Sequence, residues 1–463
     1  MTLASADPPD HISIPLAPQA IWVERLIWVF AMSFALDYRN AVAREGGSGA
    51  GIDQLLFLTL CIASTAGIVG LGWRYLTVRP GFWLIAFWGL FMAFMLINAA
   101  GQAVQIGRAI RVALPMVFCL FGITNAHIAG CMGIRPSRIV SAVFSAACIN
   151  IIWRIVQGFL FKEASLDTVR FEIVSPANDW LAAWISCAVL LRGRFTWTLL
   201  LACTVLFIGV FITITRSLIF PVIVGGIAGL FCFMLGVYWR QYQWRSLGKR
   251  LLPVGAALII LLTSISLVAV FQPAMLERWN ERLFHNTSSV NLSADISYLT
   301  RRAEADAIMK ILSADPVHFI NGRGIGSSYY WDRAYISEIT LVIPMLDDGF
   351  DDIWFAGHST WTYSLLSGGV IALSSFVILL ISVALYSLIS ARANAMDPGP
   401  DQWLAFLPFV ATCCLISISM VANPFQERLV GIIFGMMAGL PQAFMVRSSW
   451  IHTAARPLPS LAP

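Results

Sequence analysis

Long apolar runs separated by short polar connections make up most of the chain, and their lengths are the first guide to the fold. A helix needs about 20 largely apolar residues to cross a bilayer. Twelve runs approach this length: 20–36, 52–72, 81–98, 110–126, 139–161, 176–191, 195–213, 217–238, 251–270, 359–389, 403–421 and 428–446. The tenth run is long enough for a tilted span plus a helical extension. The pattern predicts an all-α polytopic membrane protein with about twelve transmembrane helices.

The composition supports this prediction and removes several alternatives. Of 463 residues, 58% are apolar and 12% are charged, whereas a soluble domain carries about 25% charged residues. A soluble fold of this length needs a polar exterior that such a chain cannot supply. A disordered chain, a coiled coil and an ordinary cytosolic enzyme are therefore excluded. The net charge of +5 is mild and does not indicate a nucleic-acid partner.

Basic residues in the connections predict which side of the membrane each end faces. The richer set of connections, with the C-terminal tail, contains Arg74, Arg79, Arg135, Arg138, Arg192, Arg194, Arg240, Arg245, Lys249, Arg250, Arg392, Arg447 and Arg456. The poorer set contains Arg39, Arg44, Arg108, Arg111, Lys162, Arg170 and Arg428. The richer set is expected in the cytoplasm, so that both termini lie inside and segment 271–358 lies outside. Residues 1–19 contain no Lys or Arg and do not resemble a signal peptide, so we expect the first helix to remain as an anchor.

We expect three parts: about nine spans within 1–270, an extracytoplasmic loop at 271–358, and about three spans with a cytoplasmic tail at 359–463. The loop is predicted to be partly helical. Residues 295–314 carry a helical apolar pattern, with Asp295 or Ser297 as the cap and Pro316 as the end. All of the nine cysteines except Cys131 fall inside apolar runs, and we expect small buried hydrophobes rather than disulfides or zinc ligands.

Arg216 is the only charged residue between Phe195 and Trp239, and it lies at the outer end of a predicted span. An Arg within the bilayer costs about 2.5–3.5 kcal/mol on insertion scales, so such residues usually line a cavity. Snorkelling to lipid phosphates is the structural alternative. Arg154, in the fifth predicted span, could join Arg216 in one cavity or could also snorkel.

Two features of the loop could contact an anionic group. Arg301 and Arg302 point to different faces of the predicted helix, so we expect one of them to aim at a site. The run Gly322-Arg323-Gly324-Ile325-Gly326 allows close approach of the backbone to a ligand, and exposed N–H groups there could hold phosphate. This run does not follow a strand of a βαβ unit, which argues against a dinucleotide site.

His358 is the one histidine of six that lies where the loop re-enters the membrane. A histidine at this position can act as a base near neutral pH, and it can equally be an interfacial residue. The acidic cluster Asp347–Asp352 could bind a divalent cation through oxygen ligands. An acidic solvated loop is the commoner explanation of such a cluster.

The order of these groups resembles a known family. It runs through Thr215-Arg216-Ser217 at the end of a span, Arg301 and Arg302 upstream of Asp315-Pro316, Gly322-x-Gly324, His358-Ser359 and Gly368-Gly369-Val370, with Pro176-Ala177-Asn178 before the sixth span. This order resembles the O-antigen ligase and polysaccharide polymerase superfamily of bacteria, most clearly over 170–390. The chain departs from that pattern at Ser359, where many relatives have Asn, and at Ala305, where an aromatic residue often follows the loop Arg.

The resemblance implies a metal-independent, inverting glycosyltransferase in the bacterial inner membrane, with the loop in the periplasm and no cofactor. Such enzymes move a glycan from a polyprenyl-diphosphate carrier to a hydroxyl on another glycan, a lipid core or a protein. Surface polysaccharide polymerisation and ligation, alone or with other assembly proteins, are both consistent with the resemblance. The expected partners are the lipid-linked donor, a glycan or lipid-core acceptor and the bilayer.

The resemblance also implies roles for individual residues. His358 matches the family histidine and would be the general base. Arg216 and one of Arg301 or Arg302 would hold the diphosphate, because guanidinium groups suit phosphate oxygens. Our other candidate substrate-binding residues are Arg323, Gly324 and Arg154.

Three other functions remain open. Twelve spans with both termini inside also suit a transporter or flippase for a lipid-linked or anionic solute, although its site would need access from both faces. A non-catalytic scaffold in a polysaccharide-assembly complex would tolerate changes at Arg216 or His358. A metal-dependent glycosyltransferase would use Asp347–Asp352 and would lose activity in a chelator.

Overall fold

Apolar helices long enough to cross a membrane form most of the protein. The computed structural model describes residues 18–38, 52–79, 81–161, 173–213, 215–280, 296–331, 335, 353–354, 357, 359–396 and 399–445. Within these ranges, eight helices have the length and hydropathy of a membrane span. They are α2 (Ile52–Gly72, continued by η1, Trp73–Tyr75), α3 (Gly81–Gly101), α4 (Ile106–Cys131), α5 (Pro136–Phe161), α9 (Ile219–Tyr238), α16 (Thr360–Ala393), α17 (Leu407–Ser419, preceded by η9, Gln402–Phe406) and α18 (Arg428–Gly439, in a span that continues to Met445). A helical membrane protein is therefore confirmed.

The other four predicted runs are helical as well. They form α1 (Pro18–Met32), α7 (Ala177–Cys187, continued by the π-helical turn η2, Ala188–Arg192), α8 (Trp197–Thr213) and α10 (Leu247–Phe271). The first three are shorter than an ordinary span. Each predicted run thus coincides with a helix, and the total of twelve spans stays a prediction.

The remaining elements complete the described chain. They are η3 (Arg216–Leu218), η4 (Trp244–Ser246), α11 (Pro273–Asn280), α13 (Ile296–Ser313), α14 (Pro316–Asn321), β1 (Tyr329–Tyr330), β2 (Ile353–Trp354), η8 (Asn394–Met396) and η10 (Pro424–Gln426). The helix expected over 295–314 is confirmed as α13. Pro316 also begins α14, where Asp315 caps the helix by accepting a hydrogen bond from the Val317 N–H at 2.9 Å.

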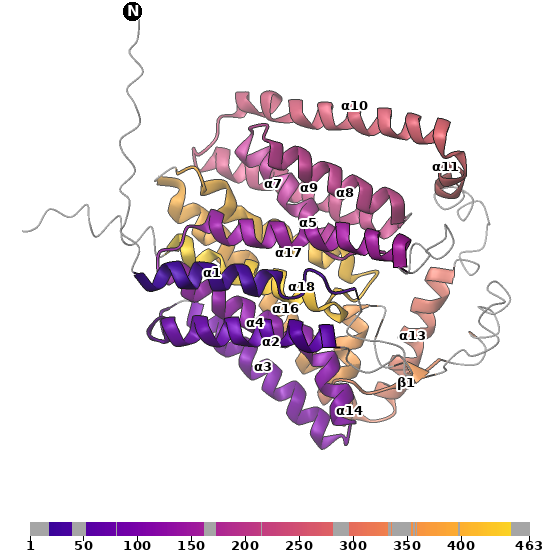
Figure 1. The fold of residues 1–463 in the computed structure, drawn as a ribbon. Coiled ribbons are helices and arrows are strands. Elements are labelled where there is room, and N and C mark those ends of the chain that lie inside the picture. Colours follow the sequence, from indigo (N-terminus) through magenta and orange to yellow (C-terminus); the bar gives the residue numbers. More distant parts are fainter. Residues whose placement is uncertain are drawn as a thin grey trace, which may run out of the picture.

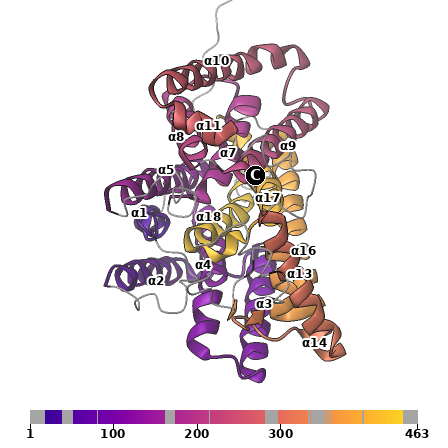
Figure 2. The same ribbon diagram turned by 90° about the vertical axis from the view of Figure 1, so that its right-hand side faces the viewer.

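The long apolar helices lie side by side, and α11, α13, α14 and β1 gather at one end of the bundle, on the right in Figure 1. We call this end the loop end. Figure 2 views the protein from the loop end and shows α13 and α14 beside α16, with which both are in contact. The strands β1 and β2 pair antiparallel, with Tyr329 opposite Trp354.

Three glycines allow α18 to pack directly on the backbone of α4. Gly431, Gly435 and Gly439 repeat every fourth residue and therefore share one face of α18. A β-carbon on Gly439 would lie 2.5 Å from the Ile123 carbonyl oxygen, and one on Gly435 would overlap the Cys119 carbonyl oxygen. Small residues at this spacing let membrane helices approach closely, so this seam places α18 in the interior of the bundle.

α16 is a broken helix, whereas the sequence predicted a tilted span with an extension. Gly368 has φ −145° and ψ 18°, and Gly369 has φ 62° and ψ −156°. The break frees the carbonyls of Leu366 and Ser367 from their helical partners. The chain after α14 supplies new donors, because the Arg323 N–H donates to Leu366 O at 2.7 Å and the Gly324 N–H donates to Ser367 O at 2.9 Å.

The Asn98 side chain fastens the same junction from α3. Its amide donates to the Asn321 carbonyl at 2.5 Å and to the Ser367 carbonyl at 3.2 Å. Backbone groups at membrane depth must be satisfied within the protein. The chain around residues 321–324 is therefore a structural part of the membrane bundle.

We expect Gly435→Ala to destabilise the protein, because the added methyl group forces α18 away from α4. Overpacking of a filled interior costs about 1–3 kcal/mol. Gly89→Ala in α3 is the matched control, since a β-carbon there meets nothing within 4 Å. Thermal unfolding in detergent should give a lower Tm for Gly435→Ala and a nearly unchanged Tm for Gly89→Ala. Equal Tm values would contradict the seam.

Candidate functional site

The turn between α17 and α18, residues 419–427, is the platform on which the candidate region is assembled. Arg301 on α13 donates to the Val421 carbonyl from Nη2 at 2.8 Å and from Nε at 3.2 Å. Ser359, the cap of α16, donates from Oγ to the Ser419 carbonyl at 3.3 Å. The platform thus brings α13 and the start of α16 together, although they are far apart in the sequence.

Two further contacts hold the chain on both sides of position 358. The Gln426 side-chain amide donates to the Gly357 carbonyl, and the Thr360 hydroxyl donates to Asn423 Oδ1 at 3.1 Å. His358 itself lies outside the described residues. Its two neighbours along the chain are described, and both belong to the assembly around the platform.

The structure distinguishes the two loop arginines. Arg301 is half-buried and reaches the platform, whereas the Arg302 side chain is 55% exposed. Arg302 pairs with Asp306 on the same helix, with 3.7 Å between Nε and Oδ2. Of the two residues, Arg301 therefore faces the platform.

The glycine-rich run has a different environment from the one expected. The N–H groups of Arg323 and Gly324 donate to carbonyls of α16, and the Gly326 N–H donates to the Tyr363 hydroxyl at 3.1 Å. These amides are bonded inside the protein, whereas the sequence suggested exposed amides. The Arg323 side chain is exposed.

Arg216 begins η3, between α8 and α9. This connection belongs to the loop end, because Trp279 of α11 donates from Nε1 to the Phe211 carbonyl at 2.8 Å and stacks on the Phe211 ring. The backbone of Arg216 is described, and its guanidinium lies outside the described part of the chain.

Arg154 is buried in an ion pair. Its side chain meets Glu427 in a bidentate arrangement, with Nη2–Oε2 at 2.6 Å and Nη1–Oε1 at 3.3 Å. Nη1 also donates to the Val174 carbonyl at 2.5 Å, and the residue is 4% exposed. Arg154 is therefore a partner of the platform and does not snorkel to the surface.

A second buried ion pair lies next to the first in the sequence. Arg428 Nη1 is 3.1 Å from Asp37 Oδ2 and also contacts Gln54, whose amide donates to Asp37 Oδ1 at 2.9 Å. Sequence reasoning missed these residues and Glu427. A signal was present, because all three ionisable groups stand at the loop-end termini of predicted spans.

Glu304 is another buried group that the sequence did not single out. It is 1% exposed on α13, and its Oε1 accepts from the Thr362 hydroxyl at 2.7 Å. The buried Tyr329 hydroxyl donates to the same carboxylate. Burial raises the pKa of Tyr329 well above its ordinary value, and the negative charge of Glu304 raises it further.

Arg301 places a permanent positive charge at the loop end, against the platform, where it can attract an anion. The N-terminus of α16 lies against the same platform, and its partial positive charge is already met by the side chains of Ser359 and Glu304. Among the described residues, no group of three or more His, Cys, Asp or Glu side chains could hold a metal ion. The acidic cluster Asp347–Asp352 lies wholly outside the described residues.

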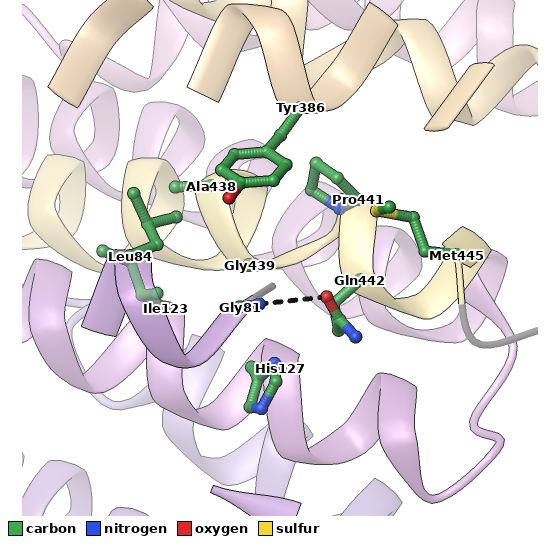
Figure 3. Close-up of a pocket in the computed structure, with 10 residues that line it drawn as sticks. All are labelled: Gly81, Leu84, Ile123, His127, Tyr386, Ala438, Gly439, Pro441, Gln442 and Met445. Atoms are coloured by element: carbon green, nitrogen blue, oxygen red, sulfur yellow. Dashed lines mark hydrogen bonds between the residues drawn. The ribbon is translucent and has the colours of Figure 1, made fainter. Parts of the chain in front are cut away.

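Two cavities are lined by no residue of the platform. One lies where α4 and α16 approach their C-termini, opposite to the loop end, and is lined by His127, Tyr386 and Gln442 (Figure 3). The Gly81 N–H donates there to the Gln442 side chain at 3.2 Å. The other is lined by apolar side chains of α17 and α18 and by Asp179 of α7, whose Oδ1 accepts no hydrogen bond from the described residues.

No protein-family model matches this chain, and a comparison with curated proteins also finds no match.

Replacing Arg154 by Met should destabilise the protein strongly, because Glu427 would stay buried without its partner. Breaking a buried pair in this way costs about 3–5 kcal/mol. Arg302→Met is the matched control, since an exposed pair such as Arg302–Asp306 contributes about 0–1 kcal/mol. Thermal unfolding in detergent should separate the two variants. A similar Tm for both would show that Arg154 and Glu427 are not held as described.

Proposed function

We propose that this protein is a membrane glycosyltransferase of the O-antigen ligase type. It moves a glycan from a polyprenyl-diphosphate carrier to an acceptor hydroxyl in surface polysaccharide polymerisation or ligation. The observation that carries the proposal is the joint attachment of Arg301 and Ser359 to residues 419–427. It supports a site in which Arg301 and His358, the residue before Ser359, act on one substrate.

The proposed chemistry is a single displacement with inversion. His358 removes the proton from the acceptor hydroxyl, which is otherwise a poor nucleophile. Arg301 and Arg216 stabilise the negative charge that develops on the departing diphosphate. The resemblance of residues 170–390 to the superfamily supports these roles, and neither a metal nor a nucleotide is required in the proposed reaction.

We expect purified protein to transfer an oligosaccharide from a polyprenyl-diphosphate donor to a glycan or lipid-core acceptor in the presence of EDTA. His358→Ala should lower kcat by about 10²–10⁴-fold, the usual contribution of a general base. Arg216→Ala and Arg301→Ala should each lower it by about 10²–10³-fold. Arg302→Ala is the control and should stay close to wild type.

The reaction products and two negative outcomes decide among the alternatives. A ladder of products would indicate a polymerase, and a single addition would indicate a ligase. Unchanged turnover in folded His358→Ala would remove the general-base assignment, and loss of wild-type activity in EDTA would favour a metal-dependent enzyme.

A transporter is the second candidate, and the break in α16 favours it. Transporters often place substrate sites at discontinuous helices. In this protein, the carbonyls of Leu366 and Ser367 at the break are occupied by the chain around residues 321–324. Movement of a labelled lipid-linked glycan across vesicles, without glycosylation of any acceptor, would support this candidate.

The proposed site faces the periplasm, and labelling of single cysteines can test this. Arg302→Cys at the loop end should react with a membrane-impermeant maleimide once the outer membrane is opened. Arg194→Cys, which is exposed at the other end, should react only after the inner membrane is also opened. The half-buried Cys203 and Cys413 are replaced by Ala to lower the background. The reverse labelling pattern would overturn the orientation.

A further inference from the structure

Glu304 connects the helix that carries Arg301 to the N-terminus of α16. It lies three residues after Arg301, so both side chains project from neighbouring positions on one face of α13. Its Oε1 accepts from the Thr362 hydroxyl at 2.7 Å and from the Ser359 N–H at 3.4 Å. With 1% exposure, this carboxylate is enclosed at the contact.

The carboxylate completes the cap of α16 from another helix. The first N–H groups of a helix lack helical partners and carry partial positive charge. Ser359 caps α16 with its own side chain, which accepts from the Trp361 N–H at 3.3 Å. Glu304 accepts hydrogen bonds from the Ser359 N–H and from the Thr362 hydroxyl. Its negative charge therefore lies at the helix N-terminus, which favours an anion.

The same carboxylate lies against the backbone that precedes α16. A β-carbon on Gly357 would lie 2.8 Å from Glu304 Oε1, and the Gly357 carbonyl accepts from Gln426. Contacts therefore hold residue 357 between Glu304 and the platform, and they hold residue 359 by its N–H and its hydroxyl. Residues 357 and 359, the chain neighbours of position 358, are both held by these contacts.

We propose that Glu304 is a positioning residue of the transferase, which sets the backbone around position 358 at a fixed separation from Arg301. This inference rests on the proposed function. Glu304 touches no reacting atom in the proposal. It acts through the N-terminus of α16, and the rigid helix α13 transmits the spacing between the proposed base and the proposed diphosphate ligand.

The test compares Glu304→Ala, which removes the acceptor, with Glu304→Gln, which keeps a side-chain oxygen at the same place. Asp306→Ala is the control for the loss of an acidic side chain on the exposed face of α13. Kinetics with a polyprenyl-diphosphate oligosaccharide should give a kcat about 10²-fold lower for Glu304→Ala, the effect of a small misplacement of reacting groups. KM for the donor should change little, and Glu304→Gln should recover most of kcat.

Hydrogen–deuterium exchange of peptides that cover residues 357–362 supplies a second measurement that does not depend on activity. Exchange should be faster in Glu304→Ala and close to wild type in Glu304→Gln and Asp306→Ala. If Glu304→Ala does not fold, Thr362→Val removes one of the three donors to Glu304 named above and should raise the same exchange more weakly.

Unchanged exchange in Glu304→Ala would overturn the proposal whatever the activity. Equal loss of kcat in Glu304→Gln and Glu304→Ala would also overturn it, because the charge and not the spacing would then be required. If wild type transfers no glycan but exchange follows the expected order, the proposed function is wrong. The contacts of Glu304 with residues 357 and 359 are then still supported.

Discussion

The need to satisfy backbone carbonyls inside the membrane bundle is the constraint on which the loop end depends. Where α16 breaks at Gly368 and Gly369, the carbonyls of Leu366 and Ser367 cannot turn to lipid for donors. The amides after α14 supply these donors. The chain that follows α13 is therefore attached to the bundle by its own backbone, and α13 is brought down onto the start of α16. A surface loop without this attachment would have no fixed register against the spans.

Two buried ion pairs also hold the helices around the platform together. Arg154 with Glu427 and Arg428 with Asp37 join α1, α5 and α18 close to the loop end. Each charge would be costly alone in an apolar bundle, and each is compensated by a partner within hydrogen-bond distance. Because Glu427 is the last residue of the platform, the position of the turn that supports Arg301 and Ser359 depends on these pairs.

The proposed function and the observed geometry support each other at specific residues. The resemblance implies roles for one of Arg301 or Arg302 and for His358, the residue before Ser359. More than fifty residues of sequence separate these positions. In the structure, Arg301 and Ser359 contact carbonyls two residues apart on the same turn. The exposed Arg302 side chain does not make such a contact with the turn in this structure; it pairs with Asp306 on its own helix.

The helical membrane architecture is predictable from the chain alone, because span length and apolarity follow from bilayer thickness and are local properties of the chain. The helix α13 is predictable in the same way, since its apolar periodicity and proline boundary are local signals. Three features came only from folding: Arg301 and not Arg302 contacts the platform, Arg154 is paired with Glu427, and the amides of Arg323 and Gly324 donate to α16. Each of these depends on a partner distant in the chain. Periodicity cannot specify such a partner, since it reports which face of a helix is buried but not what that face meets.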